Sequence, residues 1–207
     1  MKLLYFFDDK IKRYMLKGKK YCNPTETGNY ECGISCIRQN DVNLWFYTKN
    51  GVTIAIDAGH LNFKEVEKSF KKIDINPKEI RHLFITHADV DHCGGIDVCG
   101  TNIFPNAKVY LGKEEKAYLN GTTHRMIKLG VKLKNCVQVA FTQYPDMNKK
   151  SLLKLKKLSL KIQPEYVCTG HSGMRAFSEK IFAHMNESAQ FSRKRPFDNK
   201  APYDICN

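Results

Sequence analysis

The chain has 207 residues and a hydrophobic fraction of 42%, which are enough for one sizeable core and favour a single domain over residues 1–207. No apolar run approaches the roughly 18–20 residues of a membrane helix, so a helical membrane protein is excluded. The net charge of +13 comes mostly from lysines spread along the chain, so we interpret it as composition rather than as a nucleic-acid site.

The start of the chain does not resemble a secretion signal. Asp8 and Asp9 interrupt its apolar residues before they reach the roughly 7–15 residues that such a signal needs. We therefore expect a cytoplasmic protein with no membrane partner and with its eight cysteines reduced. Cys32 and Cys36 are close in sequence, but a metal or redox site would need a second such pair.

A β-hairpin is the clearest element of the first half. Residues 42–48 and 52–57 are rich in β-branched and aromatic side chains, and Asn50-Gly51 between them favours a type I′ turn. A helix should follow near residues 62–70, where a capping-box pattern precedes apolar residues at helical spacing. That helix is expected to cover the sheet.

A short apolar strand, residues 83–85, leads into the most informative stretch of the chain. Side chains of types that bind transition metals follow it within six positions: His87, Asp89, Asp91 and His92. Ligands this close in sequence must lie on an irregular loop, since a strand would send alternate side chains to opposite faces. A carboxylate that only caps the next helix would explain one of the four and not the others.

The second half is predicted to hold a strand at residues 108–111, a short helix at 113–119 and a longer helix rich in leucine and lysine. The longer helix should start at a cap, Asp146 or Asn148, and run to about Leu160. Its lysines are expected to face solvent. Its leucines are expected to form a core stripe: Leu152, Leu153, Leu155 and Leu160.

The last informative stretch repeats the arrangement of strand, histidine and glycine turn. An apolar strand at residues 166–168 precedes Gly170-His171, and a helix is expected from about Arg175 to Gln190. Residues 192–207 are basic and are expected to form a loose tail.

The spacing of His87, Asp89, Asp91 and His92, followed by two glycines, resembles the signature of the metallo-β-lactamase-fold hydrolases in its variant with aspartate in the second position. The resemblance implies an α/β fold, an αββα sandwich, whose second half is shortened here. It also implies one or two metal ions at the sheet edge, Zn²⁺ or alternatively Mn²⁺ or Fe²⁺. A metal-activated water would attack an ester, thioester, lactone, lactam or phosphodiester in a small-molecule substrate.

The resemblance also assigns roles to single residues. The metal ligands would be His87, Asp89, Asp91, His92 and His171. The last three would bind one ion, and the first two would contribute to another. Asp91 is the candidate catalytic residue, because it could ligate the ion or accept a proton from the water. Asp57, at the end of the second hairpin strand, matches an aspartate that supports the metal loop by orienting a ligating histidine.

The chain departs from the family between the metal loop and His171. The family has two further ligands there, and only His124 and Asp146 are of suitable type near the right order. The favoured interpretation is a metallo-hydrolase. The alternatives are a degenerate relative that binds metal without turnover and a basic nucleic-acid-binding protein. Since missing strands would expose a sheet edge, a homodimer is a further hypothesis.

Overall fold

The structure is a computed structural model, which describes residues 24–60, 64–96, 102–116, 145–171 and 173–182. These residues belong to two compact units. The first contains the described residues up to 116 together with Cys168–Met174, and the second contains the remaining ones. The single domain predicted for the whole chain stays a prediction.

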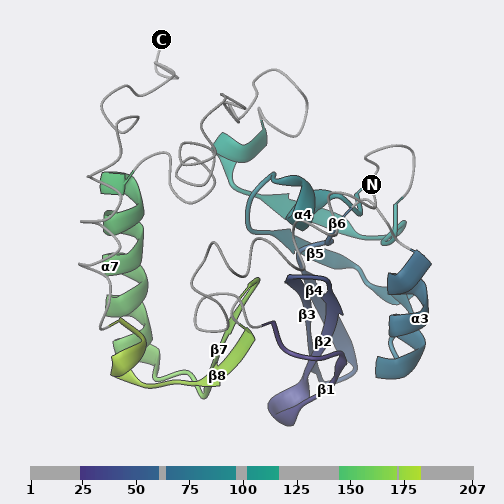
Figure 1. Cartoon of the computed structure of the whole chain (residues 1–207), viewed down its shortest axis with the longest axis horizontal. Coiled ribbons are helices and arrows are strands. Elements are labelled where there is room, and N and C mark those ends of the chain that lie inside the picture. The colour runs from purple at the N-terminus through teal and green to yellow at the C-terminus, as the bar shows by residue number, and fades with distance from the viewer. Residues whose placement is uncertain (1–23, 61–63, 97–101, 117–144, 172, 183–207) are drawn as a thin grey trace. The chain divides into compact units, whose positions relative to one another are not determined.

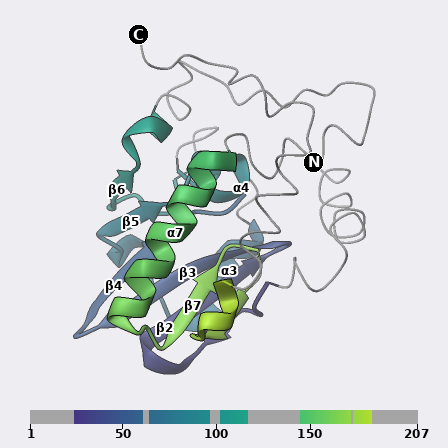
Figure 2. The same ribbon diagram turned by 90° about the vertical axis from the view of Figure 1, so that its left-hand side faces the viewer.

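A six-stranded mixed sheet is the framework of the first unit, with its strands in sequence order (Figure 1). The strands are β1 Gly28–Asn29, β2 Ile34–Gln39, β3 Val42–Lys49, β4 Val52–Ile56, β5 His82–Ile85 and β6 Lys108–Leu111. Neighbours from β1 to β4 run antiparallel, whereas β5 and β6 are parallel to the strand before them. Figure 2 shows β2, β3 and β4 side by side. The predicted mixed α/β class is confirmed.

The predicted hairpin is present as β3 and β4, paired in a register that sets Trp45 opposite Ile56. Asn50 and Gly51 have φ angles of 51° and 76°, the two positive values that a type I′ turn requires. The predicted helix follows as α3 Lys64–Ile73, while residues 62 and 63 of that prediction lie outside the described part of the chain.

Helix α3 buries an apolar face in the core of the first unit, as its spacing predicts. Val66, Phe70 and Ile73 are almost completely buried. The Phe70 ring meets Phe46 of β3 edge-on at a centroid distance of 5.5 Å and Phe104 at 5.9 Å. This packing keeps the ends of β4 and β5 in a fixed relation.

Short helical turns lie beside the other strands of the first unit. They are η4 Pro77–Glu79 before β5, α4 Val90–Cys93 after β5 and η5 Lys113–Glu115 after β6, and a further turn, η3 Glu31–Gly33, connects β1 and β2. The side chain of Asn76 accepts a hydrogen bond from the Lys78 N–H and so starts η4. Strand β6 confirms the prediction for residues 108–111, and only the start of the helix predicted for 113–119 is described, as the 3₁₀ turn η5.

The second unit contains α7, Pro145–Ile162, which confirms the predicted long helix but begins before either predicted cap. The predicted core stripe is wrong for Leu153 and Leu155, which are each 49% exposed, whereas Ser159 is buried. Because leucines and lysines alternate irregularly along this helix, apolar spacing alone does not fix the face that is buried.

A two-stranded sheet follows α7, formed by β7 Tyr166–Thr169 and β8 Gly173–Ala176. Strand β7 confirms its prediction, but the helix predicted from Arg175 to Gln190 is wrong over residues 175–182, and the rest of it lies outside the described residues. Residues 173–176 pair as a strand, and a 3₁₀ turn, η6 Glu179–Phe182, follows. The local sequence could not reveal a pairing that depends on β7. Residues from 183 onward, including the predicted tail, lie outside the described part.

Two other sequence predictions can be compared with the structure. No described helix is both long enough and apolar enough to cross a membrane. Among the described residues, Cys36, Cys93 and Cys168 are free thiols, and the reduced state expected for all eight cysteines stays a prediction.

Candidate metal centre

The loop after β5 carries the histidines and aspartates of the sequence motif, and backbone hydrogen bonds fix it to the residues after β4. Ala58 N–H donates to the His92 carbonyl at 2.7 Å, and Gly94 N–H donates to the Gly59 carbonyl at 2.8 Å. A Cβ on Gly95 would collide with the carbonyl oxygen of Ala58, so only glycine allows this close approach.

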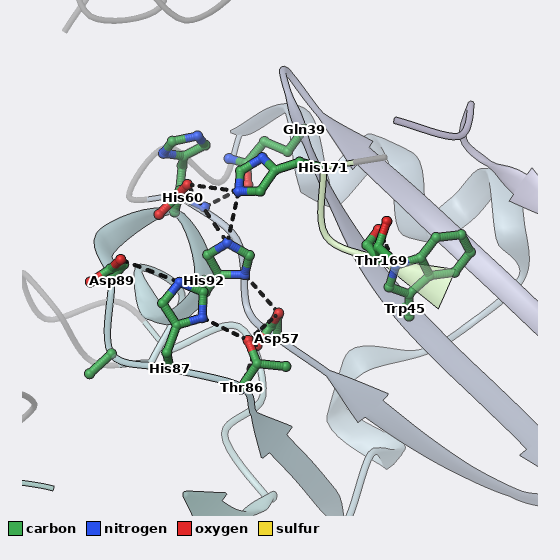
Figure 3. Close-up of polar contacts among 12 residues, drawn as sticks. Gln39, Trp45, Asp57, His60, Thr86, His87, Asp89, His92, Thr169 and His171 are labelled. Atoms are coloured by element: carbon green, nitrogen blue, oxygen red, sulfur yellow. Dashed lines mark hydrogen bonds and ion pairs between the residues drawn. The ribbon is translucent and has the colours of Figure 1, made fainter. Parts of the chain in front are cut away.

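Asp57 links the end of β4 to this loop, as predicted from its position (Figure 3). One carboxylate oxygen accepts hydrogen bonds from the Thr86 N–H at 2.8 Å and the Thr86 hydroxyl at 2.9 Å. The other oxygen lies 2.7 Å from Nδ1 of His92. Because a carboxylate only accepts hydrogen bonds, Nδ1 of His92 must carry a hydrogen.

His171 meets His92 from the turn between β7 and β8. Its Nδ1 lies 2.9 Å from the backbone carbonyl oxygen of Asp41, so this nitrogen also carries a hydrogen. The Nε2 atoms of His92 and His171 then face each other at 3.2 Å (Figure 3). In the neutral rings both atoms present a lone pair, and two lone pairs at this distance repel unless a proton or a cation lies between them.

Asp91 completes a group of three ligands. Its Oδ2 lies 3.7 Å from Nε2 of His92 and 3.6 Å from Nε2 of His171. One ligand atom from each of the three residues lies within 4.8 Å of the other two. Two imidazoles and a carboxylate are suitable ligands for zinc and similar ions, so the residues fit the metal that the sequence motif implies.

His87 and Asp89 lie beside this group, and the rings of His87 and His92 are 4.1 Å apart. Nε2 of His87 lies 3.3 Å from Oδ2 of Asp89. Asp89 precedes helix α4, but its side chain makes no cap hydrogen bond to the helix. The side chain of Asp89 therefore does not act as a helix cap. Burial lowers the pKa of His87, but the hydrogen bond and negative charge of Asp89, with the charges of Asp57 and Asp91, outweigh this and raise it.

The turn that carries His171 is fixed to β3. Asn43 N–H donates to the carbonyl of Gly170 at 2.7 Å, and Trp45 Nε1–H donates to the carbonyl of Thr169 at 3.1 Å. A Cβ on Gly170 would lie only 2.7 Å from Cε1 of His92. Glycine at this position therefore lets the turn approach the ring of His92.

The sequence did not indicate three residues that surround the site. Asp41 is fully buried beside His171, and His60, which the sequence could not distinguish from a surface histidine, is buried beside Asp41. Glu115 accepts a hydrogen bond from the Ala88 N–H at 2.8 Å and so supports the metal loop. These residues are distant in sequence from the motif, and no local pattern marks them.

Two residues considered as replacement ligands remain outside this site description. His124 lies outside the described residues. Asp146 lies in the first turn of α7, in the second unit. Whether either residue replaces a missing family ligand is therefore not tested.

Comparison with known proteins gives a partial match. The family model described as the metallo-beta-lactamase superfamily matches residues 37–117. A metallo-beta-lactamase of Cronobacter sakazakii with a HARLDQ motif is 19% identical, with a TM-score of 0.43, over 53% of this chain and 42% of its own. BJP-1, a subclass B3 metallo-beta-lactamase of Bradyrhizobium japonicum, is 21% identical, with a TM-score of 0.42, over 50% of this chain and 39% of its own.

The chain thus spans well under half the length of these solved structures. AidC, a dizinc quorum-quenching lactonase, is 26% identical over 37% of this chain and 28% of its own, with a TM-score of 0.33. No curated protein matches the sequence.

Proposed function

We propose that the chain is a metal-dependent hydrolase of the metallo-beta-lactamase superfamily, whose family model matches residues 37–117. The observation that supports the proposal most directly is the pair of Nε2 atoms of His92 and His171, 3.2 Å apart, with the carboxylate of Asp91 beside both. Each histidine has its other ring nitrogen bonded to an acceptor. Both rings are thus prepared to donate a lone pair to a cation.

The group of Asp91, His92 and His171 is the binding site that we assign to the ion, with zinc as the first candidate. Three protein ligands and one open position are usual for a catalytic zinc. Such an ion would polarise a carbonyl or phosphoryl group and make a water molecule acidic enough to react near neutral pH. His87 and Asp89 supply two donors for a second ion, so the group of three should fill first.

Asp91 is the residue to which we assign a role in proton transfer. It is the carboxylate of the group of three, and its side chain is 18% exposed while that of His92 is 4% exposed. The carboxylate therefore faces both the ligand nitrogens and the solvent. It can help hold the ion and accept a proton from water, whereas the two histidines have both ring nitrogens in use.

The substrate that we propose is a small molecule with an ester, thioester, lactone, lactam or phosphodiester bond, and the proposed location is the cytoplasm. The proposed partners are this small-molecule substrate and, as a further proposal, a second copy of the chain, with nucleic acid not expected. Among the described residues, the carboxylate of Asp91 belongs to the ion site, and that of Asp89 lies beside His87. A polyanion would be repelled here unless an ion is bound.

Metal content and activity test this function together. The full-length protein, purified without added metal, should contain about one equivalent of zinc, manganese or iron per chain, and a chelator should abolish its hydrolysis of a panel of these substrates. His171→Ala should lose metal and activity, and Asp91→Asn should lose activity. His82→Ala is the matched control, because Nδ1 of His82 contacts the Tyr110 hydroxyl and not the metal ligands.

Two results would contradict the proposal. Wild-type protein that takes up no metal on dialysis against zinc would remove the metal site. Metal bound in full by a protein that hydrolyses nothing in the panel would remove the hydrolase assignment and leave a metal-binding relative without turnover.

A further inference from the structure

A fully buried carboxylate lies behind His171, on the side of the ring away from His92. It belongs to Asp41, in the two-residue turn between β2 and β3. Burying a charged carboxylate costs free energy unless other groups compensate for it. Its surroundings therefore indicate what the charge is used for.

Two imidazole rings flank the two oxygens of this carboxylate. Oδ2 of Asp41 lies 3.6 Å from Nδ1 of His171, and Oδ1 lies 3.5 Å from Nε2 of His60. The backbone carbonyl of Asp41 is closer still to His171, at 2.9 Å from Nδ1. Both the carbonyl and the carboxylate of this one residue thus face the same N–H of His171.

His60 is itself held in place. Its backbone N–H donates to Oε1 of Gln39 at 2.8 Å, and the side chain is buried (Figure 3). Gly59 allows this contact, because a Cβ there would collide with the same Gln39 oxygen. The end of β2, the segment after β4 and the turn of His171 therefore meet at Asp41.

The arrangement matches the one behind His92. There, the buried carboxylate of Asp57 receives the Nδ1–H of His92 at 2.7 Å and leaves Nε2 directed at the ligand group. A carboxylate or carbonyl behind a ligating histidine fixes its tautomer and ring orientation and makes the other nitrogen a better donor. The negative charge of Asp41 acts in the same direction on His171.

We propose that Asp41 is a positioning residue for His171, held from behind by His60. Its carbonyl and carboxylate keep the hydrogen on Nδ1 and the lone pair on Nε2 directed at the cation. This inference rests on the proposed metal site, because it assigns the purpose of the tautomer to metal binding. Asp41 itself touches neither ion nor substrate in this scheme.

The decisive variant is Asp41→Asn, which keeps the backbone carbonyl and the side-chain shape but removes the charge. Zinc affinity of the full chain, measured by competition with a chromophoric chelator, should fall by about tenfold to a hundredfold. The absorption spectrum of the cobalt-loaded protein should change as well, because the orientation of a ligand ring changes. Asp74→Asn, at an exposed position, is the matched control and should leave both unchanged.

Nitrogen NMR of the metal-free protein gives a second reading that does not depend on metal binding. His171 should carry its hydrogen on Nδ1 in the wild type, and Asp41→Asn, which keeps the carbonyl but loses the negative charge, should lower the share of this tautomer without reversing it. If the wild-type protein binds no zinc, the proposed function fails, and this tautomer shift alone decides the inference. If Asp41→Asn does not fold, His60→Gln takes its place under the same criteria, with His82→Gln as its control.

The inference is overturned if zinc affinity changes by less than about threefold in a folded Asp41→Asn protein that keeps the wild-type cobalt spectrum. It is equally overturned if the metal-free wild type carries the hydrogen of His171 on Nε2, or if the variant leaves the tautomer unchanged.

Discussion

Replacing Asp57 with asparagine exchanges one acceptor oxygen for a donor at the junction of β4 and the metal loop. The backbone there has a φ of 63°, a left-handed conformation that asparagine tolerates well. In the wild type, the two carboxylate oxygens of Asp57 accept hydrogen bonds from Thr86 and from His92. The side-chain amide of asparagine has only one acceptor oxygen for these two donors. The Thr86 N–H cannot change its role, so His92 must accept at Nδ1 and move its hydrogen to Nε2.

The consequences can be given magnitudes from these contacts. Hydrogen bonds to a charged group contribute about 1 kcal/mol more than neutral ones, so three weakened contacts would lower the free energy of unfolding by about 3 kcal/mol. The Thr86 side chain is exposed, so water replaces part of its share, and we expect about 2 kcal/mol. The effect on zinc affinity should be a loss of about tenfold to a hundredfold, since a hydrogen on Nε2 of His92 blocks the ligand position.

Urea unfolding of the metal-free protein and chelator competition measure the two effects separately. Asp74→Asn is the matched control, because Asp74 also has a left-handed backbone, with a φ of 54°, but is exposed. A loss of stability without a loss of zinc affinity would mean that Asp57 only joins two segments. That result would refute the reasoning from the tautomer of His92.

Three further predictions follow from the geometry, the pKa values and the sheet. Gly170→Ala should weaken zinc binding by displacing the His92 ring, whereas Gly28→Ala, where a Cβ has no neighbour closer than 3.8 Å, should not; equal affinities would contradict this. Burial raises the pKa of the Cys36 thiol from 9.0 to about 12, so its contribution to stability is complete below pH 9 and is lost as the pH rises toward 12. Urea unfolding should therefore show lower stability at about pH 10 than at about pH 8, with a smaller difference in Cys36→Ala. Strand β6 is the last strand of the described sheet, and pairing of two copies of the chain along β6 predicts a dimer. Light scattering at working concentration should detect the mass of a dimer, and a monomeric mass would contradict the prediction.

Local signals in the sequence predicted much of the first unit. Asn50-Gly51 determines the hairpin turn through its two positive φ angles, which depend on no distant contact. Val66 and Phe70 of α3 keep helical spacing and lie in the core as expected. The predicted motif also brings Asp91 and His92 next to His171, although their sequence separation is about eighty residues. Here the resemblance to the family predicted that His171 lies near the motif, which the spacing of residues along the sequence could not predict.

The errors occur where a distant partner decides the local structure. Residues 175 and 176 were predicted to start a helix, but they belong to strand β8, which pairs with β7, and Met174 N–H of the same strand donates to the Thr25 hydroxyl at 2.7 Å. Leu153 and Leu155 were predicted to be in a core, but helical periodicity does not determine which neighbour a helix packs against. Both errors concern contacts between segments and not the propensity of a segment.

The same distinction explains why Asp57 was predicted and Asp41 was not. The resemblance to the family pointed to Asp57, and the parallel pairing of β4 with β5 is what brings it beside the motif loop. Asp41 reaches His171 only because Asn43 and Trp45 of β3 bind the turn at Thr169 and Gly170. A motif reveals which side chains can ligate an ion, but their tautomers depend on acceptors that the fold supplies. The buried acceptors behind His92 and His171 therefore carry information about metal binding that the motif does not contain.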